Sequence, residues 1–323
     1  MARISIVAGG AGFIGANLVR HLLPQRDAIV VIDNFARGSR AWLEPLVDGR
    51  KVQVIKADLA DRAAVNVAFD AAAAVGPIDE VWHLAANSDI PAGVSDPDVD
   101  FKDTFCTTFE LLLAMRRFQV PVLHFASTSA IYGDLGDAVL HESIGPLLPI
   151  SNYGAMKLAS EAQASAAAES FLQRANIFRF PNVVGVPATH GVILDFVNKL
   201  KADPSQLSVL GNGTQQKAYL HVSDLIAAMM AIVERPSATK VEVVNIGPVD
   251  EGVTVRWIAE QLVARVAPRA RIVYGSGNKG WVGDVPRFNY SIDRLRSYGW
   301  SPTLGSAEAI LRAINEIAVQ QGV

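Results

Sequence analysis

Short apolar runs alternate with longer helical segments over the first 180 residues of the chain. The apolar runs are rich in isoleucine and valine and end at glycine, proline or polar residues, which is typical of buried strands. Because strands and helices alternate, we predict an α/β fold with a doubly wound parallel sheet. The predicted strands are Arg3–Ala8, Ala28–Ile32, Val52–Ala57, Glu80–Ala86, Pro121–Ser127 and Ala175–Phe180, and the longest predicted helices are Asp61–Ala74, Asp98–Phe118 and Ser151–Arg174.

This alternation stops after Pro181, and the remaining chain mixes helices, short strands and loops. A helix at Ser223–Glu234 and a strand at Val241–Ile246 have the pattern of a return to the sheet. We therefore predict one domain in residues 1–180, with return elements near 219–247, and a smaller, partly interleaved domain in residues 181–323. The other elements expected there are the loop Gly185–Gly191, the helix Val192–Leu200, the turn Gly211–Gly213, the helix Thr254–Val266, the strand Arg271–Tyr274, the loop Gly275–Pro286 and the helix Ser306–Gln320.

Composition narrows the classes of function. Half of the 323 residues are apolar and 19% are charged, which is ordinary for an enzyme. The formal net charge of −3 leaves no electrostatic footprint for nucleic acid. Cys106 is the one cysteine, so it excludes an internal disulfide, and we expect it on a buried helix face. The six histidines lack metal-ligand spacing, so we predict no metal.

The distribution of apolar residues also predicts neither a membrane-spanning helix nor a signal peptide. No apolar run approaches the length of a membrane-spanning helix, so we predict no membrane association. The apolar strand near the N-terminus is too short for the core of a signal peptide. A cytoplasmic location is therefore expected.

The first predicted strand leads into Gly9-Gly10-Ala11-Gly12-Phe13-Ile14-Gly15 and then into a helix that continues to Leu23. This order matches the dinucleotide-binding fingerprint, in which glycines let the backbone approach the pyrophosphate and the helix N-terminus faces it. Asp33 follows the next strand, where a carboxylate binds the ribose hydroxyls of NAD and repels a 2′-phosphate. Arg37 lies close enough in the sequence to leave NADP open. The plainer interpretation of the glycines is a structural turn.

Tyr153 and Lys157 are spaced so that they lie on one face of a helix. A lysine ammonium stabilises a phenolate, so we expect Lys157 to lower the pKa of Tyr153 and make it a general acid or base. The preceding strand ends in Ser127-Thr128-Ser129, whose hydroxyl groups are candidates for orienting a substrate. The Tyr/Lys pair alone is a common pattern, and Thr128 also suits a backbone cap at a strand end.

Further motifs follow these in order along nearly the whole chain. They are Asp33-Asn34, Asp58-Leu59, His83–Ala86, Ser127–Gly133, Arg179–Gly185, Gly211–Gly213, Tyr219–Asp224 and Leu295-x-x-x-Gly299-Trp300. With the glycine loop and the Tyr/Lys pair, they resemble the extended short-chain dehydrogenase/reductase family, in particular its NAD-dependent nucleotide-sugar epimerases of the UDP-glucose 4-epimerase type. The resemblance implies a Rossmann sheet in the first domain, a substrate-binding role for the second domain and a nucleotide-sugar substrate.

The resemblance also implies roles for individual residues. Tyr153 is the catalytic acid or base, Lys157 holds the nicotinamide ribose, and Thr128 bridges the substrate hydroxyl and the tyrosine. Plainer interpretations remain for three of the substrate residues: Asn182 as a turn residue, His190 as a loop residue and Lys217 as a surface residue. The implied NAD-binding set is Gly9, Gly12, Phe13, Ile14, Gly15, Asp33, Asn34, Asp58, Leu59, Leu84, Ala85, Ala86, Tyr153 and Lys157, and the implied substrate-binding set is Ser129, Asn182, His190 and Lys217.

The residues after Thr128 distinguish the reactions of the family. Its 4,6-dehydratases carry Asp-Glu directly after the catalytic threonine, and its decarboxylases usually carry a glutamate there, whereas this chain has Ser129 and Ala130. Elimination of water needs a second acid and base, so the sequence favours a 4-epimerase with tightly bound NAD. UDP-glucose/galactose or a UDP-uronic acid is the first expectation for the substrate. The alternatives are a 4-keto reductase and a non-catalytic dinucleotide sensor.

The chain departs from the family pattern in places. Trp281 stands where an arginine usually binds the pyrophosphate, and Lys279 or Arg287 is a candidate to supply the missing charge. Lys217 replaces another usual arginine and cannot offer a bidentate fork to phosphate. Asp103 stands where asparagine is common near the nicotinamide. The resemblance also implies a homodimer, in which the helices at 99–118 and 151–174 pair in a four-helix bundle.

Overall fold

The computed structural model describes residues 3–47, 51–136, 138–235, 239–277 and 289–323. The chain forms two compact units that alternate along the sequence. The first unit contains residues 1–133, 146–179 and 232–244, and the second contains residues 134–145, 180–231 and 245–323. The assignment of the first unit to the cofactor and of the second to the substrate stays a prediction.

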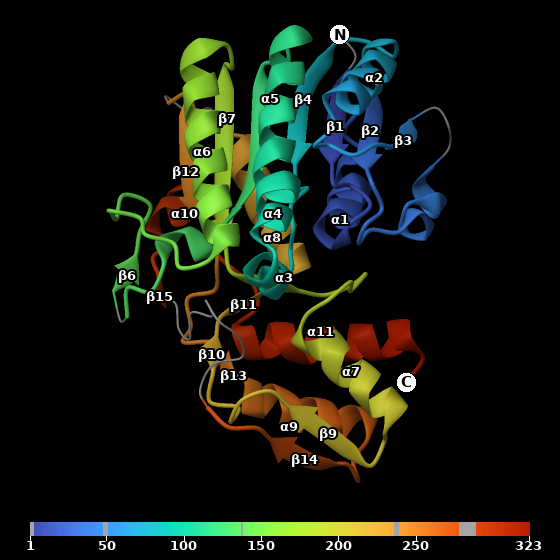
Figure 1. The fold of residues 1–323 in the computed structure, drawn as a ribbon, viewed down its shortest axis with the longest axis vertical. Helices are drawn as coiled ribbons and strands as arrows, with labels where there is room; N and C mark the ends of the chain where they lie inside the picture. The colour runs from blue at the N-terminus through green and yellow to red at the C-terminus, as the bar shows by residue number, and fades with distance from the viewer. Residues whose placement is uncertain (1–2, 48–50, 137, 236–238, 278–288) are drawn as a thin grey trace. The chain divides into compact units, whose positions relative to one another are not determined.

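A seven-stranded sheet forms the centre of the first unit (Figure 1). The ladders that join β3, β2, β1, β4 and β5 are parallel, and β1 lies between β2 and β4, where the strand order reverses. The predicted doubly wound Rossmann sheet is therefore confirmed, and the strand expected to return near residue 241 does join it. In sheet order, the strands are β12 (Val241–Asn245), β7 (Arg174–Phe180), β5 (Val122–Thr128), β4 (Ile78–His83), β1 (Ile4–Ala8), β2 (Ala28–Asp33) and β3 (Val52–Lys56).

Helices cover the sheet and bury its apolar side chains. Their bounds are α1 (Phe13–Leu22), α2 (Arg62–Ala73), α3 (Ile90–Ser95), α4 (Pro97–Asp100), a π-helical stretch (Phe101–Cys106), α5 (Thr107–Arg117) and α6 (Asn152–Ser170). Three short 3₁₀ turns span Arg40–Trp42, Glu44–Leu46 and Ser129–Tyr132. One core cluster lies between the sheet and α2, α5 and α6, and includes Ile6, Val30, Phe69, Leu111 and Phe125.

Local side chains explain where these helices begin. Asp61 caps α2 by accepting from the Ala63 N–H at 2.8 Å, and Ser151 caps α6 by accepting from the Gly154 N–H at 3.1 Å. The predicted helix at Asp98–Phe118 is not one regular helix, because α4 and α5 are joined by the π-helical stretch. Helix α6 ends at Ser170, before the predicted Arg174, because Arg174 is already the first residue of β7.

The described part of the second unit is built from short paired strands and several helices. The strand pairs are β6 (Val139–Leu140) with β15 (Asn289–Tyr290), β8 (Asn182–Val184) with β11 (Tyr219–His221), β9 (Gln206–Val209) with β14 (Arg271–Tyr274), and β10 (Gln216–Lys217) with β13 (Val253–Thr254). The helices are α7 (Val192–Ala202), α8 (Val222–Val233), α9 (Val255–Val266), α10 (Asp293–Ser297) and α11 (Ser306–Gln321). A second core cluster joins α7, α9 and α11 through side chains such as Phe196, Leu262 and Ile314. No helix in the described ranges has the length and apolar character needed to cross a membrane.

A buried ion-pair network ties the start of β4 to neighbouring elements of the first unit. The Glu80 carboxylate lies 2.9 Å from the Arg26 guanidinium and 3.1 Å from His124 Nε2, and it also accepts from the Trp82 indole N–H. Burial opposes the charge of Glu80, but hydrogen bonds and charges from His124 and Arg26 hold its pKa well below the ordinary value. The network therefore stabilises the fold when the Glu80 carboxylate is ionised.

We expect Glu80→Gln to destabilise the protein by about 3 kcal/mol at neutral pH, because it leaves Arg26 buried without its partner. The pKa of Glu80 is lowered from 4.5 in the folded state, so this stabilisation is present above that pH and is lost as the pH falls. The variant should therefore lose less stability than the parent below pH 4.5. Chemical denaturation followed across acidic pH measures both effects. Asp70→Asn, which removes an exposed ion pair with Arg117, is the control and should change little.

Candidate active site

The glycine turn lies at the carboxyl end of β1, and helix α1 begins in it at Phe13. Gly9 has a φ of +79°, and a Cβ there would lie 2.6 Å from the backbone nitrogen of Ala85. Gly12 is the N-cap of α1, and no side chain caps the N-terminus of this helix. The turn therefore presents free helix N–H groups and a backbone surface without side chains, which fits a dinucleotide pyrophosphate.

Asp33 is fixed at the end of β2 by the same turn. Its two carboxylate oxygens accept from the backbone N–H groups of Ala11 at 2.9 Å and Phe35 at 2.8 Å. Burial raises the pKa of Asp33, although these two hydrogen bonds act against the rise. Asn34 accepts from the Ala36 N–H at 2.9 Å and so helps to shape the loop after β2. These contacts hold the carboxylate where a ribose would be recognised.

The other predicted cofactor residues follow β3 and β4. Burial opposes the charge of Asp58, but a hydrogen bond from the Ala60 N–H at 2.9 Å and an ion pair with Lys102 at 3.0 Å lower its pKa. Leu59 is buried. Leu84 donates its N–H to the Ala8 carbonyl at 2.9 Å, beside the glycine turn. The predicted strand through Ala86 is too long, because β4 ends at His83. Leu84, Ala85 and Ala86 are half-buried, and their contact with NAD stays a prediction.

The three predicted catalytic side chains come together in the first unit. Thr128 ends β5, and its side chain hydrogen-bonds to the phenol of Tyr153 in the first turn of α6. Thr128 also accepts from the Ala130 N–H at 3.1 Å, so the capping role considered above is real as well. Lys157 is 2% exposed, and its ammonium donates to the Ala126 carbonyl at 2.7 Å. The ammonium lies 6.0 Å from the centre of the Tyr153 ring.

The pKa of Tyr153 corrects one expectation from the sequence. Although the residue as a whole is half-buried, the packing around its hydroxyl raises the pKa to about 12, despite the Thr128 hydrogen bond. Burial lowers the pKa of Lys157 to about 7, while the nearby charge of Glu161 acts in the opposite direction. The loss of hydration on both groups outweighs the attraction between ammonium and phenolate. At neutral pH the phenol of the protein alone therefore keeps its proton.

Asp100 is a buried acid that sequence analysis did not single out. It is 0% exposed, its Oδ1 accepts from the Asn87 side-chain N–H at 2.8 Å, and its Oδ2 has no hydrogen-bond partner. It packs against the Cα of Gly93, whose carbonyl accepts from the Asn152 side chain next to Tyr153 at 2.8 Å. The charge of Asp100 raises the pKa of Tyr153. Burial raises the pKa of Asp100 itself.

A second buried group, also missed, supports the catalytic strand and helix. The Arg179 guanidinium binds both carboxylate oxygens of Glu161, at 3.0 and 2.6 Å, and donates to the Tyr132 hydroxyl at 3.1 Å. Ser127 donates to the same Glu161 carboxylate. These contacts join the end of β5, the turn after it, helix α6 and β7. The available signal was the position of Glu161, one helical turn beyond Lys157.

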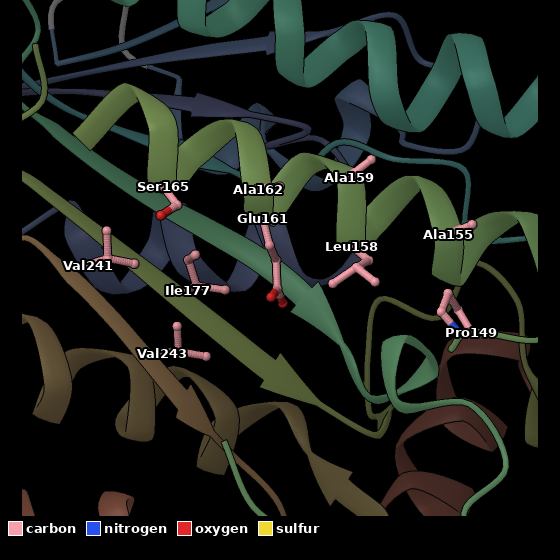
Figure 2. Close-up of a pocket in the computed structure, with 10 residues that line it drawn as sticks. All are labelled: Pro149, Ala155, Leu158, Ala159, Glu161, Ala162, Ser165, Ile177, Val241 and Val243. Atoms are coloured by element: carbon pink, nitrogen blue, oxygen red, sulfur yellow. The ribbon is translucent and has the colours of Figure 1, made fainter. Parts of the chain in front are cut away.

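Glu161 also reaches the wall of an apolar hollow beside α6 (Figure 2). Leu158, Ala162 and Ser165 line this hollow from α6, and Ile177 of β7 and Val243 of β12 line it from the sheet. Neither Tyr153 nor Lys157 lines it. The hollow is therefore separate from the catalytic face of α6.

The predicted substrate residues are distributed over both units. Ser129 is buried at the start of the 3₁₀ turn in the first unit. In the second unit, Asn182 is exposed at the start of β8, and His190 is an exposed loop residue whose Nδ1 lies 2.7 Å from the Thr189 hydroxyl. Lys217 is 9% exposed in β10, so the interpretation as a solvated surface lysine is wrong. Their roles in binding substrate stay predictions.

The remaining residues considered in the sequence are Asp103, Cys106 and the three candidates near residue 281. Asp103 lies half-buried in the π-helical stretch, and burial raises its pKa. Cys106 is only partly buried, so its expected buried position is wrong. Lys279, Trp281 and Arg287 lie outside the described residues. Within the described ranges, no group of three or more His, Cys, Asp or Glu side chains is arranged to hold a metal.

Most of the sequence matches one known protein family. The NAD dependent epimerase/dehydratase family matches residues 5–247, which include the glycine turn, Asp33 and the Tyr153 helix. The chain belongs to this family. It is thus an enzyme of the extended short-chain dehydrogenase/reductase class, and the cofactor of its family is NAD. Because the chain is an enzyme of this family, it is not a non-catalytic sensor. Arg37, the residue that left NADP open, is paired with Asp89, so its charge is already balanced within the protein.

Relatives of this chain are named as either of two kinds of enzyme, epimerases and dehydratases. A putative UDP-glucose 4-epimerase of Methanocaldococcus jannaschii is 27% identical over 315 residues, which are 96% of this chain and 97% of the relative. A probable dTDP-glucose 4,6-dehydratase of Sinorhizobium fredii is 31% identical over 240 residues, 71% of this chain and 67% of that protein. The solved structure of a Thermus thermophilus UDP-glucose 4-epimerase in complex with NAD has a TM-score of 0.82 and 29% identity, and the match covers 97% of this chain and 98% of that one.

We expect Asp100→Asn to change the pH dependence of the reaction. The substitution removes the charge that raises the pKa of Tyr153 and keeps an oxygen for the Asn87 amide. The limb of kcat/KM that follows deprotonation of Tyr153 should therefore move to lower pH, by about one unit. A pH–rate profile from neutral to alkaline pH measures the shift. Asp98→Asn, an exposed acid on the same helix, should leave the limb in place.

Asp89 and Asp103 act on Asp100, and the Lys157 ammonium lies 6.0 Å from the centre of the Tyr153 ring; Asp100→Asn and Asp98→Asn leave all three groups unchanged. An unshifted limb in Asp100→Asn would show that the charge of Asp100 does not reach the phenol. A similar shift in Asp98→Asn would point instead to a general effect of net charge.

Proposed function

We propose that this enzyme is a nucleotide-sugar 4-epimerase that keeps NAD tightly bound and oxidises its substrate transiently to a 4-keto sugar. The observation that carries this proposal is the joining of Thr128, Tyr153 and Lys157 at the end of β5, with Ser129 and Ala130 where a dehydratase would need carboxylates. This set can transfer one proton at one carbon. It offers no second acid and base for eliminating water.

The residues divide the proton chemistry between them. Bound NAD would accept and return the hydride, and its positive nicotinamide would favour the phenolate form of Tyr153. Thr128 would orient the sugar hydroxyl toward Tyr153, which would take the hydroxyl proton and give it back to the ketone. Lys157, with a pKa of about 7, would gain charge as negative charge develops on the phenol. The fit of the glycine turn to a pyrophosphate supports NAD in this role.

The names of the relatives support a UDP-sugar as substrate. Two of the proteins compared above are described as UDP-glucose 4-epimerases, so UDP-glucose/galactose is the first choice and a UDP-uronic acid the second. A 4-keto reductase is the alternative, because the protonated phenol of Tyr153 could equally supply the proton for reduction of a ketone. A reductase would release oxidised cofactor at each turnover, whereas an epimerase would retain NAD. A cytoplasmic location stays a prediction.

Incubation with UDP-, GDP-, CDP- and dTDP-sugars without added cofactor tests the proposal. We expect interconversion of UDP-glucose and UDP-galactose by the purified protein, measured by separation of the sugars. Tyr153→Phe should lower turnover about a thousandfold and still retain NAD, because the phenyl ring fills the same space without the proton. Tyr298→Phe, in the second unit, is the matched control.

Absence of an isomerised product from every sugar would contradict the epimerase. Turnover that requires added reduced cofactor would identify the reductase instead. Normal activity in Tyr153→Phe would remove that residue from the acid–base role.

We also propose that the enzyme is a homodimer formed through α5 and α6. Phe101, in the π-helical stretch, and Phe109, in α5, are 51% and 42% exposed, and Phe101 stacks on Phe105 with ring centres 5.9 Å apart. Helix α6 is rich in alanine, which permits close approach of a second helix. Exposed aromatic rings such as Phe101 and Phe109 are unfavourable in water, and association of two subunits would bury them.

The Phe101→Glu/Phe109→Glu double variant should shift the protein from dimer to monomer, because it places two charges within the proposed helix bundle. Light scattering at micromolar concentration measures the mass. The control variant Val67→Glu, at an exposed apolar position on α2, should remain a dimer like the parent protein. A parent protein that is already monomeric would rule the dimer out.

A further inference from the structure

An ion pair joins the loops that follow β2 and β4. Arg37 Nη2 lies 2.8 Å from Asp89 Oδ2, and the two side chains are 40% and 38% exposed. Strand β1 lies between β2 and β4 in the sheet. The contact therefore spans the carboxyl end of β1, where the glycine turn begins. The proton chemistry of Tyr153 does not need this pair.

The loop that carries Arg37 is folded against the glycine turn. The Ser39 N–H donates to the Ala11 carbonyl at 3.0 Å, and Asp33 accepts from the Ala11 N–H at 2.9 Å. Gly38 packs so closely on Ala11 that a Cβ at residue 38 would lie 2.6 Å from the Ala11 carbonyl carbon. Both ends of this loop are thus attached to one residue of the turn.

The position of Asp89 is also fixed before it meets Arg37. The side-chain oxygen of Asn87 accepts from the Asp89 N–H at 2.9 Å, and its side-chain nitrogen donates to the Asp89 carbonyl at 2.9 Å. The same nitrogen binds buried Asp100. Asp89 Oδ1 caps α3 by accepting from the Ala92 N–H at 3.1 Å, which leaves Oδ2 for the guanidinium. Exposed ion pairs are weak partly because they must order two mobile side chains, and here one partner is already ordered.

We propose that Arg37 and Asp89 form a latch that closes over the pyrophosphate of bound NAD and slows its release. The inference rests on the proposed function, in which NAD remains bound from one turnover to the next. A dinucleotide places its pyrophosphate at the glycine turn and the N-terminus of the following helix. The latch spans the turn from one side to the other, so the pyrophosphate leaves only after the ion pair opens.

Release of NADH tests the latch directly. The protein is loaded with NADH and mixed rapidly with excess NAD, and the loss of bound-NADH fluorescence gives the release rate. Arg37→Gln and Asp89→Asn should each release NADH about fivefold faster, since each removes one charge of the pair. Asn at residue 89 retains an oxygen to cap α3. The double variant should be no faster than either single variant, because the second change removes an interaction already lost.

Two controls separate the latch from general charge effects. Arg117→Gln breaks an exposed ion pair between α5 and α2 and should leave the release rate unchanged. High salt should accelerate release from the parent toward the rate of the variants, and should change the double variant less.

Each contrary result has a distinct meaning. Unchanged release in both single variants would overturn the latch, even in a fully active epimerase. Faster release in Arg37→Gln with slower release in Asp89→Asn would also overturn it, because Arg37 would then bind the pyrophosphate in competition with Asp89. The measurement uses no sugar, so an enzyme with latch-dependent release but without isomerised product would contradict the proposed function and support the latch.

Discussion

The candidate site depends on the burial of one positive charge. Lys157 is 2% exposed, and the loss of hydration lowers its pKa to about 7. An ammonium in such a position is stable only when fixed dipoles and charges replace the lost water. Here the ammonium donates a hydrogen bond to the Ala126 carbonyl at 2.7 Å, the Phe125 ring lies 4.7 Å away, and the Glu161 carboxylate favours the charged form of the lysine. All of these groups belong to β5 and α6, so the strand and the helix must keep their positions for the lysine to remain functional.

The buried pair of Glu161 and Arg179 explains how those positions are kept. Glu161 binds Arg179 through both oxygens and receives a hydrogen bond from Ser127, the residue before Thr128. Arg179 also holds Tyr132, at the end of the turn that follows Thr128. A buried ion pair gives little net stability on its own, but its geometry is demanding, and loss of either partner leaves an unpaired charge. The pair thus serves mainly to fix the end of β5 against α6.

The sequence predicted the parts of the site that depend on local patterns. The glycine turn, Asp33 at a strand end, and Tyr153 with Lys157 on one helix face are short-range features, and each has a signature in spacing. The sign of the pKa change of Tyr153 was not predictable, because it depends on how many atoms surround the hydroxyl. The role of Asp100 and the pairing of Arg37 with Asp89 were missed for a similar reason: Asn87 and Asp89, the partners, belong to another loop, and only the order of strands brings them together. Among the short strands of the second unit, Arg271–Tyr274 was predicted with its observed bounds. The others were missed because two to four residues carry too little periodicity.

The positions of the acids limit the chemistry that the site can support. A dehydratase needs proton-transferring groups that reach two sugar carbons, and the residues next to Thr128 are Ser129, which is buried, and Ala130. The charge of Asp100 raises the pKa of Tyr153, but Asp100 is fully buried, and one of its oxygens is occupied by Asn87. It can therefore change the proton affinity of the phenol without touching a substrate. A buried charge of this kind adjusts one acid–base group and adds no second one, which supports oxidation and reduction at a single carbon over elimination.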